Sequence, residues 1–121
     1  MRVKRKATWA DVKARLEPTD RSVDEQLRFA IGHKRLVEIR YRGYNRVAEP
    51  HDYGVHGGTE KVLVYQQRGP ARSERRSATG WRLLELSKVE NCVALDETFP
   101  GSRGQSHQRH LEWDILYARV T

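Results

Sequence analysis

Between residues 36 and 95, apolar and polar side chains alternate with the period of a β-strand. The clearest example is Leu36–Arg42, where Val37, Ile39 and Tyr41 fall on one face and mostly charged residues on the other. Four further segments have strand character and are separated by turns rich in glycine or polar residues: Arg46–His56, Glu60–Arg68, Trp81–Leu86 and Val89–Leu95. Short strands joined by tight polar turns are typical of a small antiparallel barrel. The pattern therefore predicts an α+β, mainly β fold.

Helical spacing appears before this strand region. Ser22 and Glu25 form a capping-box pattern, which opens an amphipathic helix that ends near His33. A shorter helix is expected at Trp9–Leu16, where Pro18 ends it. Both helices are expected to accompany a strongly bent antiparallel β-barrel of the SH3-like or Sm-like kind.

The C-terminal residues 113–120 fit two patterns. Trp113, Leu116, Tyr117 and Val120 share a helix face, whereas Trp113, Ile115 and Tyr117 alternate like a strand. We expect a short helix that packs on the barrel. The chain then divides into three parts: a basic N-terminal segment with a short helix (1–21), the barrel with its leading helix (22–99), and a flexible loop with a C-terminal helix (100–121).

Composition places the chain among small folded proteins. It has 121 residues, of which 37% are hydrophobic and 32% are charged, enough for one modest core. No apolar run approaches the ~18 residues of a membrane span, and no apolar stretch follows the basic N-terminus, so neither a membrane location nor a secretory signal is expected. The lone Cys92 is expected to be a small buried residue and fits a reducing compartment, which predicts a cytoplasmic protein.

The formal net charge is +7, and the basic residues gather in three places. These are residues 2–6, residues 34–46 and the loop that carries Arg72, Arg75 and Arg76. A basic domain attracts polyanions, because binding releases counterions from nucleic acid. The alternative is that the excess arginine only maintains solubility or reflects codon usage. The clustering favours a polyanion-binding surface.

The same residues resemble a known family, the WYL domain of bacteria. Its opening helix and strand are matched by Ala30-Ile31, Arg35-Leu36, Ile39 and Tyr41, its next block by Val47–Pro50, and its last strand by Leu84–Val89 and Leu95–Phe99. The resemblance implies a non-enzymatic module that binds a nucleotide or single-stranded nucleic acid and serves transcriptional regulation. It also implies a separate regulatory protein partner or a homo-oligomer, because too few residues precede Ser22 for a winged helix.

Two positions depart from that family. The Trp-Tyr-Leu that names the family falls at Glu60-Lys61-Val62 and is absent. The first arginine of its late strand falls at Glu85, and only Lys88 keeps a positive charge there. These departures affect the ligand site that the resemblance implies.

Individual residues suggest a ligand face, each with a structural alternative. His51 follows Pro50 in a strand, so it lies at an edge or bulge that either blocks further pairing or presents His51 and Arg46 to a ligand. Tyr65 is either an aromatic core residue or a platform on which a base stacks. Arg82 either pairs with Glu85 or Glu97 or contacts phosphate with help from Arg75 and Arg76.

Catalytic and metal chemistry have little support in the sequence. His51 and His56 lie five apart in a strand, on opposite faces, and His107 and His110 have no cysteine or carboxylate cluster nearby. No nucleophile or metalloprotease motif is present. We therefore expect neither an enzyme nor a cofactor. The alternative to ligand sensing is a protein-interaction module whose barrel groove binds a peptide.

Overall fold

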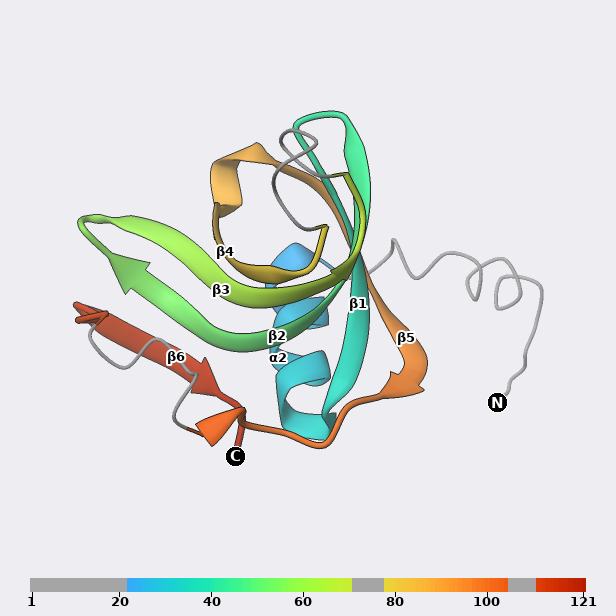
Figure 1. Ribbon diagram of the computed structural model, residues 1–121. Coiled ribbons are helices and arrows are strands. Elements are labelled where there is room, and N and C mark those ends of the chain that lie inside the picture. Colours follow the sequence, from blue (N-terminus) through green and yellow to red (C-terminus); the bar gives the residue numbers. More distant parts are fainter. Residues whose placement is uncertain (1–21, 71–77, 105–110) are drawn as a thin grey trace, which may run out of the picture.

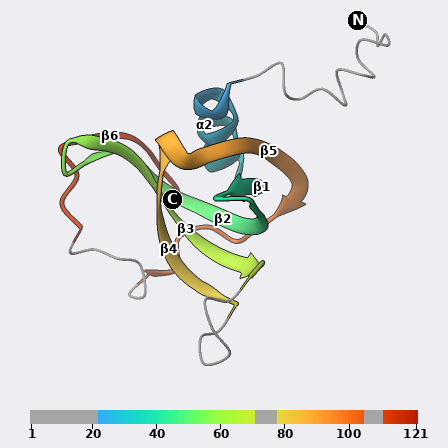
Figure 2. The ribbon, with the colours of Figure 1, turned by 90° about the horizontal axis from the view of Figure 1, so that it is seen from above.

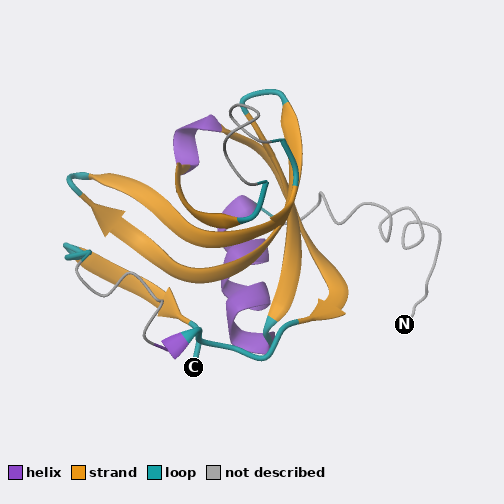
Figure 3. Ribbon diagram, viewed as in Figure 1, coloured by secondary structure: helices purple, strands orange, loops and turns teal. Residues whose placement is uncertain are grey.

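The computed structural model describes residues 22–70, 78–104 and 111–121. These residues form one helix, α2 (Val23–His33), and one strongly curled antiparallel sheet, with α2 packed at one side of it (Figures 1 and 3). The strands are β1 (Arg35–Tyr41), β2 (Tyr44–His56), β3 (Thr59–Arg68), β4 (Gly80–Glu85), β5 (Val89–Thr98) and β6 (Ile115–Arg119), with a 3₁₀ turn, η2, at Leu86–Lys88 between β4 and β5. The expected mainly β, α+β fold is confirmed.

The sheet has the order β4-β3-β2-β1-β5, and β6 pairs with β2 beside β1. All recorded pairings are antiparallel. The sheet of the described residues is not closed, because β4 and β5 stand at its two ends. Viewed from above, the strands curve around one side while α2 lies on the other (Figure 2).

Helix α2 begins at the predicted capping box. The Ser22 hydroxyl accepts the Glu25 backbone N–H at 3.1 Å, and the Glu25 carboxylate accepts the Ser22 N–H at 3.0 Å. The helix ends at His33, where Lys34 adopts a left-handed conformation. The other predicted helix, Trp9–Leu16, lies outside the described residues.

The core forms between the apolar face of α2 and the inner face of the sheet. Val37, Ile39 and Tyr41 of β1 are 0, 0 and 8% exposed, so their predicted burial on one face is confirmed. They pack in one cluster with Leu27 and Ala30 of α2 and with residues of β3, β4 and β5. Cys92 belongs to this cluster as a buried free thiol, as predicted, and burial raises its pKa to about 12.

The predicted C-terminal helix is wrong, because Ile115–Arg119 is strand β6. β2 pairs with β1 from Tyr44 as far as Ala48. Farther along, β6 pairs with the same side of β2, from Asp52 to Val55. The alternating pattern of residues 113–117 therefore described the structure, and the helical pattern did not. Pairing with a strand sixty residues away decided between them, since the backbone groups of β2 beyond Ala48 need a partner.

Pro50 lies in the interior of the sheet rather than at its edge. β2 has β3 on one side and β1 and then β6 on the other, so the edge prediction is wrong. The bulge prediction is confirmed: the β2–β3 register shifts between Pro50 and Asp52, with His51 as the extra residue. Proline is tolerated here because it falls between the last residue paired with β1 and the first paired with β6.

Gly54 gives a direct test of the β2–β6 pairing. A Cβ at this position would clash with the backbone carbonyl oxygen of Ile115. We therefore expect Gly54→Ala to lower the free energy of unfolding by about 1–3 kcal/mol, as overpacking usually does. In the Gly54→Ala variant, hydrogen exchange should be accelerated more at the β6 amides than at the β1 amides, relative to the unchanged protein.

Gly32→Ala is the matched control for that substitution. Gly32 lies in the last turn of α2, where an added Cβ meets nothing within 4 Å. It should raise the free energy of unfolding by up to ~1 kcal/mol, because alanine loses less backbone entropy in a helix. Equal losses from both substitutions would contradict the tight β2–β6 contact.

Candidate nucleic-acid interface

The β1–β2 turn holds a cationic side chain in an unusual backbone conformation. Its two central residues, Arg42 and Gly43, both have positive φ values, 52° and 83°, and Tyr41 pairs with Tyr44 across them. Two such residues in a two-residue hairpin are typical of a type I′ turn. The strand segments expected from the sequence, Leu36–Arg42 and Arg46–His56, left residues 43–45 for the turn, one residue later. Tyr44 instead begins β2, with 59% of its surface exposed.

Three arginines gather beside this turn, and we call Arg42, Arg46 and Arg82 the arginine cluster. The guanidinium groups of Arg42 and Arg46 lie 5.8 and 5.4 Å from the centroid of the Tyr41 ring. Burial lowers the pKa of Arg46, and the positive charges of Arg82 and Arg42 lower it further, while Tyr41 acts in the opposite direction. Arg46 is therefore close enough to Arg42 and to Arg82 for each of these like charges to repel it.

The partner of Arg46 is neutral. Its Nη1 donates to the side-chain oxygen of Gln66 at 2.9 Å, and its Nε is buried with no hydrogen-bond partner among the described residues. A half-buried guanidinium usually pairs with a carboxylate, because desolvation makes an uncompensated charge costly. Arg46 has an amide in that place, which leaves its positive charge available to an anion.

The carboxylates expected for Arg82 pair with other cations. Lys88 Nζ lies 2.9 Å from Glu85 Oε1, and Arg68 Nη2 lies 3.4 Å from Glu97 Oε1. Arg82 itself donates from Nη1 to the backbone carbonyl oxygen of Trp81 at 3.0 Å. Lys88, the cation that the family resemblance had suggested for a ligand, is thus engaged in a surface ion pair.

His51 is not presented at the surface. Its ring is 0% exposed and packs against Trp81 and Phe99, with centroid distances of 4.8 and 5.4 Å. Its Nε2 lies 3.0 Å from the Glu49 carboxylate. The bulge therefore turns His51 into the core, and the expectation that it faces a ligand beside Arg46 is wrong.

Tyr65 is half-buried and covered on its ring face. The Arg103 guanidinium lies 3.6 Å from the ring centroid, and Trp81 meets the ring edge-on at 5.3 Å. A base could stack on this face of Tyr65 only after Arg103 moved away. Arg72, Arg75 and Arg76 lie outside the described residues.

Glu49 is a buried carboxylate with several hydrogen-bond donors around it. It is 2% exposed and accepts two hydrogen bonds from Arg103, at 2.9 and 2.8 Å, and one from Gln67 at 2.9 Å. Burial alone would raise the pKa of Glu49, but the hydrogen bonds from Arg103, His51 and Gln67 outweigh it, and the pKa lies below its usual value. These contacts make Glu49 and Arg103 a buried structural ion pair on the side of β2 and β3 to which Gln67 points.

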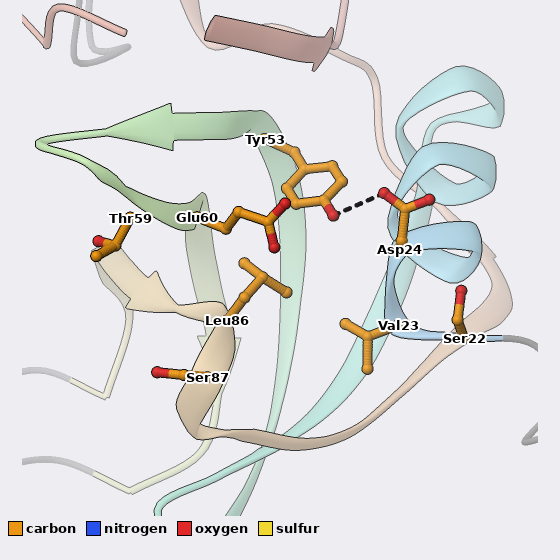
Figure 4. A pocket seen from close by; sticks show the side chains of 8 residues that line it. All are labelled: Ser22, Val23, Asp24, Tyr53, Thr59, Glu60, Leu86 and Ser87. Carbon is orange, nitrogen blue, oxygen red and sulfur yellow. Dashed lines mark hydrogen bonds between the residues drawn. The ribbon is translucent and has the colours of Figure 1, made fainter. Parts of the chain in front are cut away.

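A separate pocket of about 510 Å³ lies where the start of α2 meets the β2–β3 hairpin and η2 (Figure 4). The Tyr53 hydroxyl donates to Asp24 at 2.7 Å inside it, and burial together with this hydrogen bond raises the pKa of Tyr53. Its lining contains two carboxylates and neither lysine nor arginine, so it has the wrong charge for a polyanion. The lining residues are Ser22, Val23, Asp24, Tyr53, Thr59, Glu60, Leu86 and Ser87.

Sequence reasoning identified two members of the cluster, Arg46 and Arg82, and missed Arg42, Tyr44 and Arg103. Arg42-Gly43 carried a usable signal, since a glycine between two strands with a two-residue spacing predicts a type I′ turn. Arg103 carried none, because only the fold brings it to Glu49.

The described residues contain no group of three or more histidine, cysteine, aspartate or glutamate side chains that could hold a metal ion. Within the same residues, α2 is too short and too polar to cross a bilayer.

Comparison with known proteins returned no similarity: no protein-family model, no curated protein and no solved structure matches the chain.

The Glu49–Arg103 pair predicts a pH-dependent loss of stability. Arg103→Met keeps the apolar stem but leaves Glu49 buried without its cation, which should lower the free energy of unfolding by about 3 kcal/mol at neutral pH. In the unchanged protein, the pKa of Glu49 is lower when folded than its ordinary value of 4.5. Its stabilising contribution is therefore present above pH 4.5 and is lost as the pH falls through the folded pKa.

Urea unfolding at several pH values measures this effect. In Arg103→Met the difference from the unchanged protein should shrink at acidic pH, because protonated Glu49 no longer needs a cation. Arg40→Met is the control, since Arg40 forms an exposed pair with Glu90 and should matter little. A pH-independent difference would show that Arg103 acts through packing alone.

Proposed function

We propose that this protein is a non-enzymatic ligand-binding module of the WYL type that binds nucleic acid or a nucleotide through the arginine cluster. The observation that carries the proposal is Arg46, a half-buried guanidinium with an amide partner and with two like charges beside it. A phosphate group supplies the negative charge and the several acceptor oxygens that such a cluster lacks.

Tyr44 supports the choice of nucleic acid over a simple anion. Tyr44 is 59% exposed and directly follows the Arg42-Gly43 turn, which connects β1 to β2 at the top of Figure 1. Cationic side chains track a phosphate backbone, and exposed aromatic rings stack on unpaired bases. A single-stranded segment satisfies both, because its bases are free to stack.

The biological setting follows from the sequence resemblance. A WYL-like module in a small Sm-like barrel would sense its ligand in the cytoplasm of a bacterium and pass the signal to a separate regulatory protein or a second copy of itself, and so act in transcriptional regulation. The net charge of +7 favours association with polyanions such as nucleic acid.

A protein-interaction module remains the second candidate, and the pocket of Figure 4 favours it. Its carboxylates, Asp24 and Glu60, and its apolar side chains, Val23 and Leu86, suit a basic side chain of a peptide. Peptide binding there would be unaffected by substitutions in the arginine cluster, so the experiments below separate the two.

Arg42→Asn separates binding from folding. Asn-Gly is the preferred type I′ sequence, so the free energy of unfolding should be unchanged or higher. Binding of a fluorescent single-stranded oligonucleotide should weaken, and the slope of log affinity against log salt should fall by about 0.7, the value for one phosphate contact. Arg40→Gln removes the same charge from the Arg40–Glu90 pair and should leave both quantities nearly unchanged.

The result that contradicts the proposal is equal binding by the unchanged protein and Arg42→Asn across the salt series. Equal losses from Arg42→Asn and Arg40→Gln would instead indicate diffuse attraction by net charge, without a defined site.

The two tyrosines should respond differently to replacement by leucine. Tyr44→Leu should weaken single-strand binding by ~1–3 kcal/mol, the usual contribution of a stacked base, with little effect on a duplex. Tyr65→Leu should lower thermal stability, because Arg103 and Trp81 lose the ring they contact. Fluorescence polarisation titrations with a single-stranded and a duplex oligonucleotide measure the change in binding, and thermal melts measure the change in stability. If Tyr65→Leu weakened single-strand binding more than Tyr44→Leu does, the base would stack on Tyr65 of β3 and not on Tyr44.

A further inference from the structure

Gln66 makes an unusually complete set of contacts next to the arginine cluster. It is 0% exposed, and its Nε2 donates to the backbone carbonyl oxygens of Pro70 and Ala78, at 3.3 and 2.6 Å. Its Oε1 accepts from Arg46 at 2.9 Å. Both amide hydrogens and the amide oxygen of one side chain are therefore used.

These contacts fix which way the amide faces. With the amide turned over, its oxygen would meet two carbonyl oxygens and its NH₂ would meet the donors of Arg46, so every contact would become repulsive. The oxygen must point to Arg46. An uncharged acceptor is thus held in front of a guanidinium, which orients Arg46 without neutralising it.

The surroundings leave little room for another arrangement. A Cβ on Gly69, whose φ is 146°, would lie 3.1 Å from Gln66 Nε2 and 3.2 Å from Arg46 Cγ. The chain that leaves β3 at Gly69 therefore passes close over both side chains. Pro70 and Ala78, eight residues apart along the sequence, meet at the same amide.

We propose that Gln66 is the positioning residue of the anion site: it holds the Arg46 guanidinium in place and couples it to the backbone at Pro70 and Ala78. This inference rests on the proposed function. Because the three contacts share one amide, an anion that pulls on Arg46 also changes the hydrogen bonds to the two carbonyls. A carboxylate in this position would instead cancel the charge that an anion needs.

Gln67 offers a matched control on the same strand. It follows Gln66 directly, so its side chain points to the other face of the sheet, where its Nε2 donates to Glu49 at 2.9 Å. Gln66→Met and Gln67→Met each remove one buried or half-buried amide of the same size. Both should lower stability, but only the first touches the arginine cluster.

The experiment measures binding of a short fluorescent oligothymidylate over a salt series, at a temperature where all variants are folded. Gln66→Met should weaken binding by roughly twofold to tenfold, the effect of releasing one side chain that was held in place. The slope of log affinity against log salt should also become smaller, toward the value expected when one phosphate contact is lost. Gln67→Met should bind like the unchanged protein.

A second measurement needs no substitution. In ¹⁵N-resolved NMR spectra of the unchanged protein, the side-chain NH₂ signal of Gln66, assigned through its bonds, should shift as oligothymidylate is added, while that of Gln67 stays in place. This signal decides the question even where Gln66→Met fails to fold.

The outcomes distinguish this inference from the function on which it rests. Binding that is lost in Arg42→Asn but unchanged in Gln66→Met, or that leaves the Gln66 NH₂ signal in place, overturns the positioning role alone. Absence of binding by the unchanged protein overturns both.

Discussion

The fold depends on neutralising the carboxylates that β2 buries at its centre. Glu49 and Asp52 are 2 and 0% exposed, and each accepts two hydrogen bonds from one arginine, Arg103 or Arg119. Both arginines come from the C-terminal part of the chain, more than fifty residues away. A buried carboxylate without its cation is strongly destabilising, so the stability of β2 depends on the segments that carry Arg103 and Arg119.

The same stretch of β2 also changes its neighbour from β1 to β6. Pro50 and His51 fill the interval between the two pairings, and the bulge there turns His51 into the core. The main-chain hydrogen bond from Val120 to His51, at 2.9 Å, continues the contact with the C-terminal strand. Backbone pairing and charge neutralisation therefore act together to hold β6 and the segment that contains Arg103.

Arg46 differs from most arginines of the described chain in its partner. Carboxylates pair with Arg28, Arg35, Arg40, Arg68, Arg103 and Arg119. Arg46 has an amide partner instead, because Gln66 on β3 points toward it while Gln67 points toward Glu49. The alternation of two neighbouring glutamines thus gives Arg46 a neutral hydrogen-bond partner, while Gln67 supports the ion pair between Glu49 and Arg103.

The sequence by itself determined the local elements of this protein. Period-two alternation located β1 to β5 to within a few residues, and the Ser22–Glu25 pair located the start of α2, because these signals depend only on neighbouring residues. The tertiary structure alone decided that residues 115–119 form a strand, that His51 is buried and that Arg103 covers Tyr65. Each of these depends on a partner far away in the chain, whether a free stretch of β2 backbone or a buried carboxylate, and local patterns carry no information about such partners. The arginine cluster lies between the two cases, since its charges can be read from the sequence but its amide partner appears only when β3 folds beside β2.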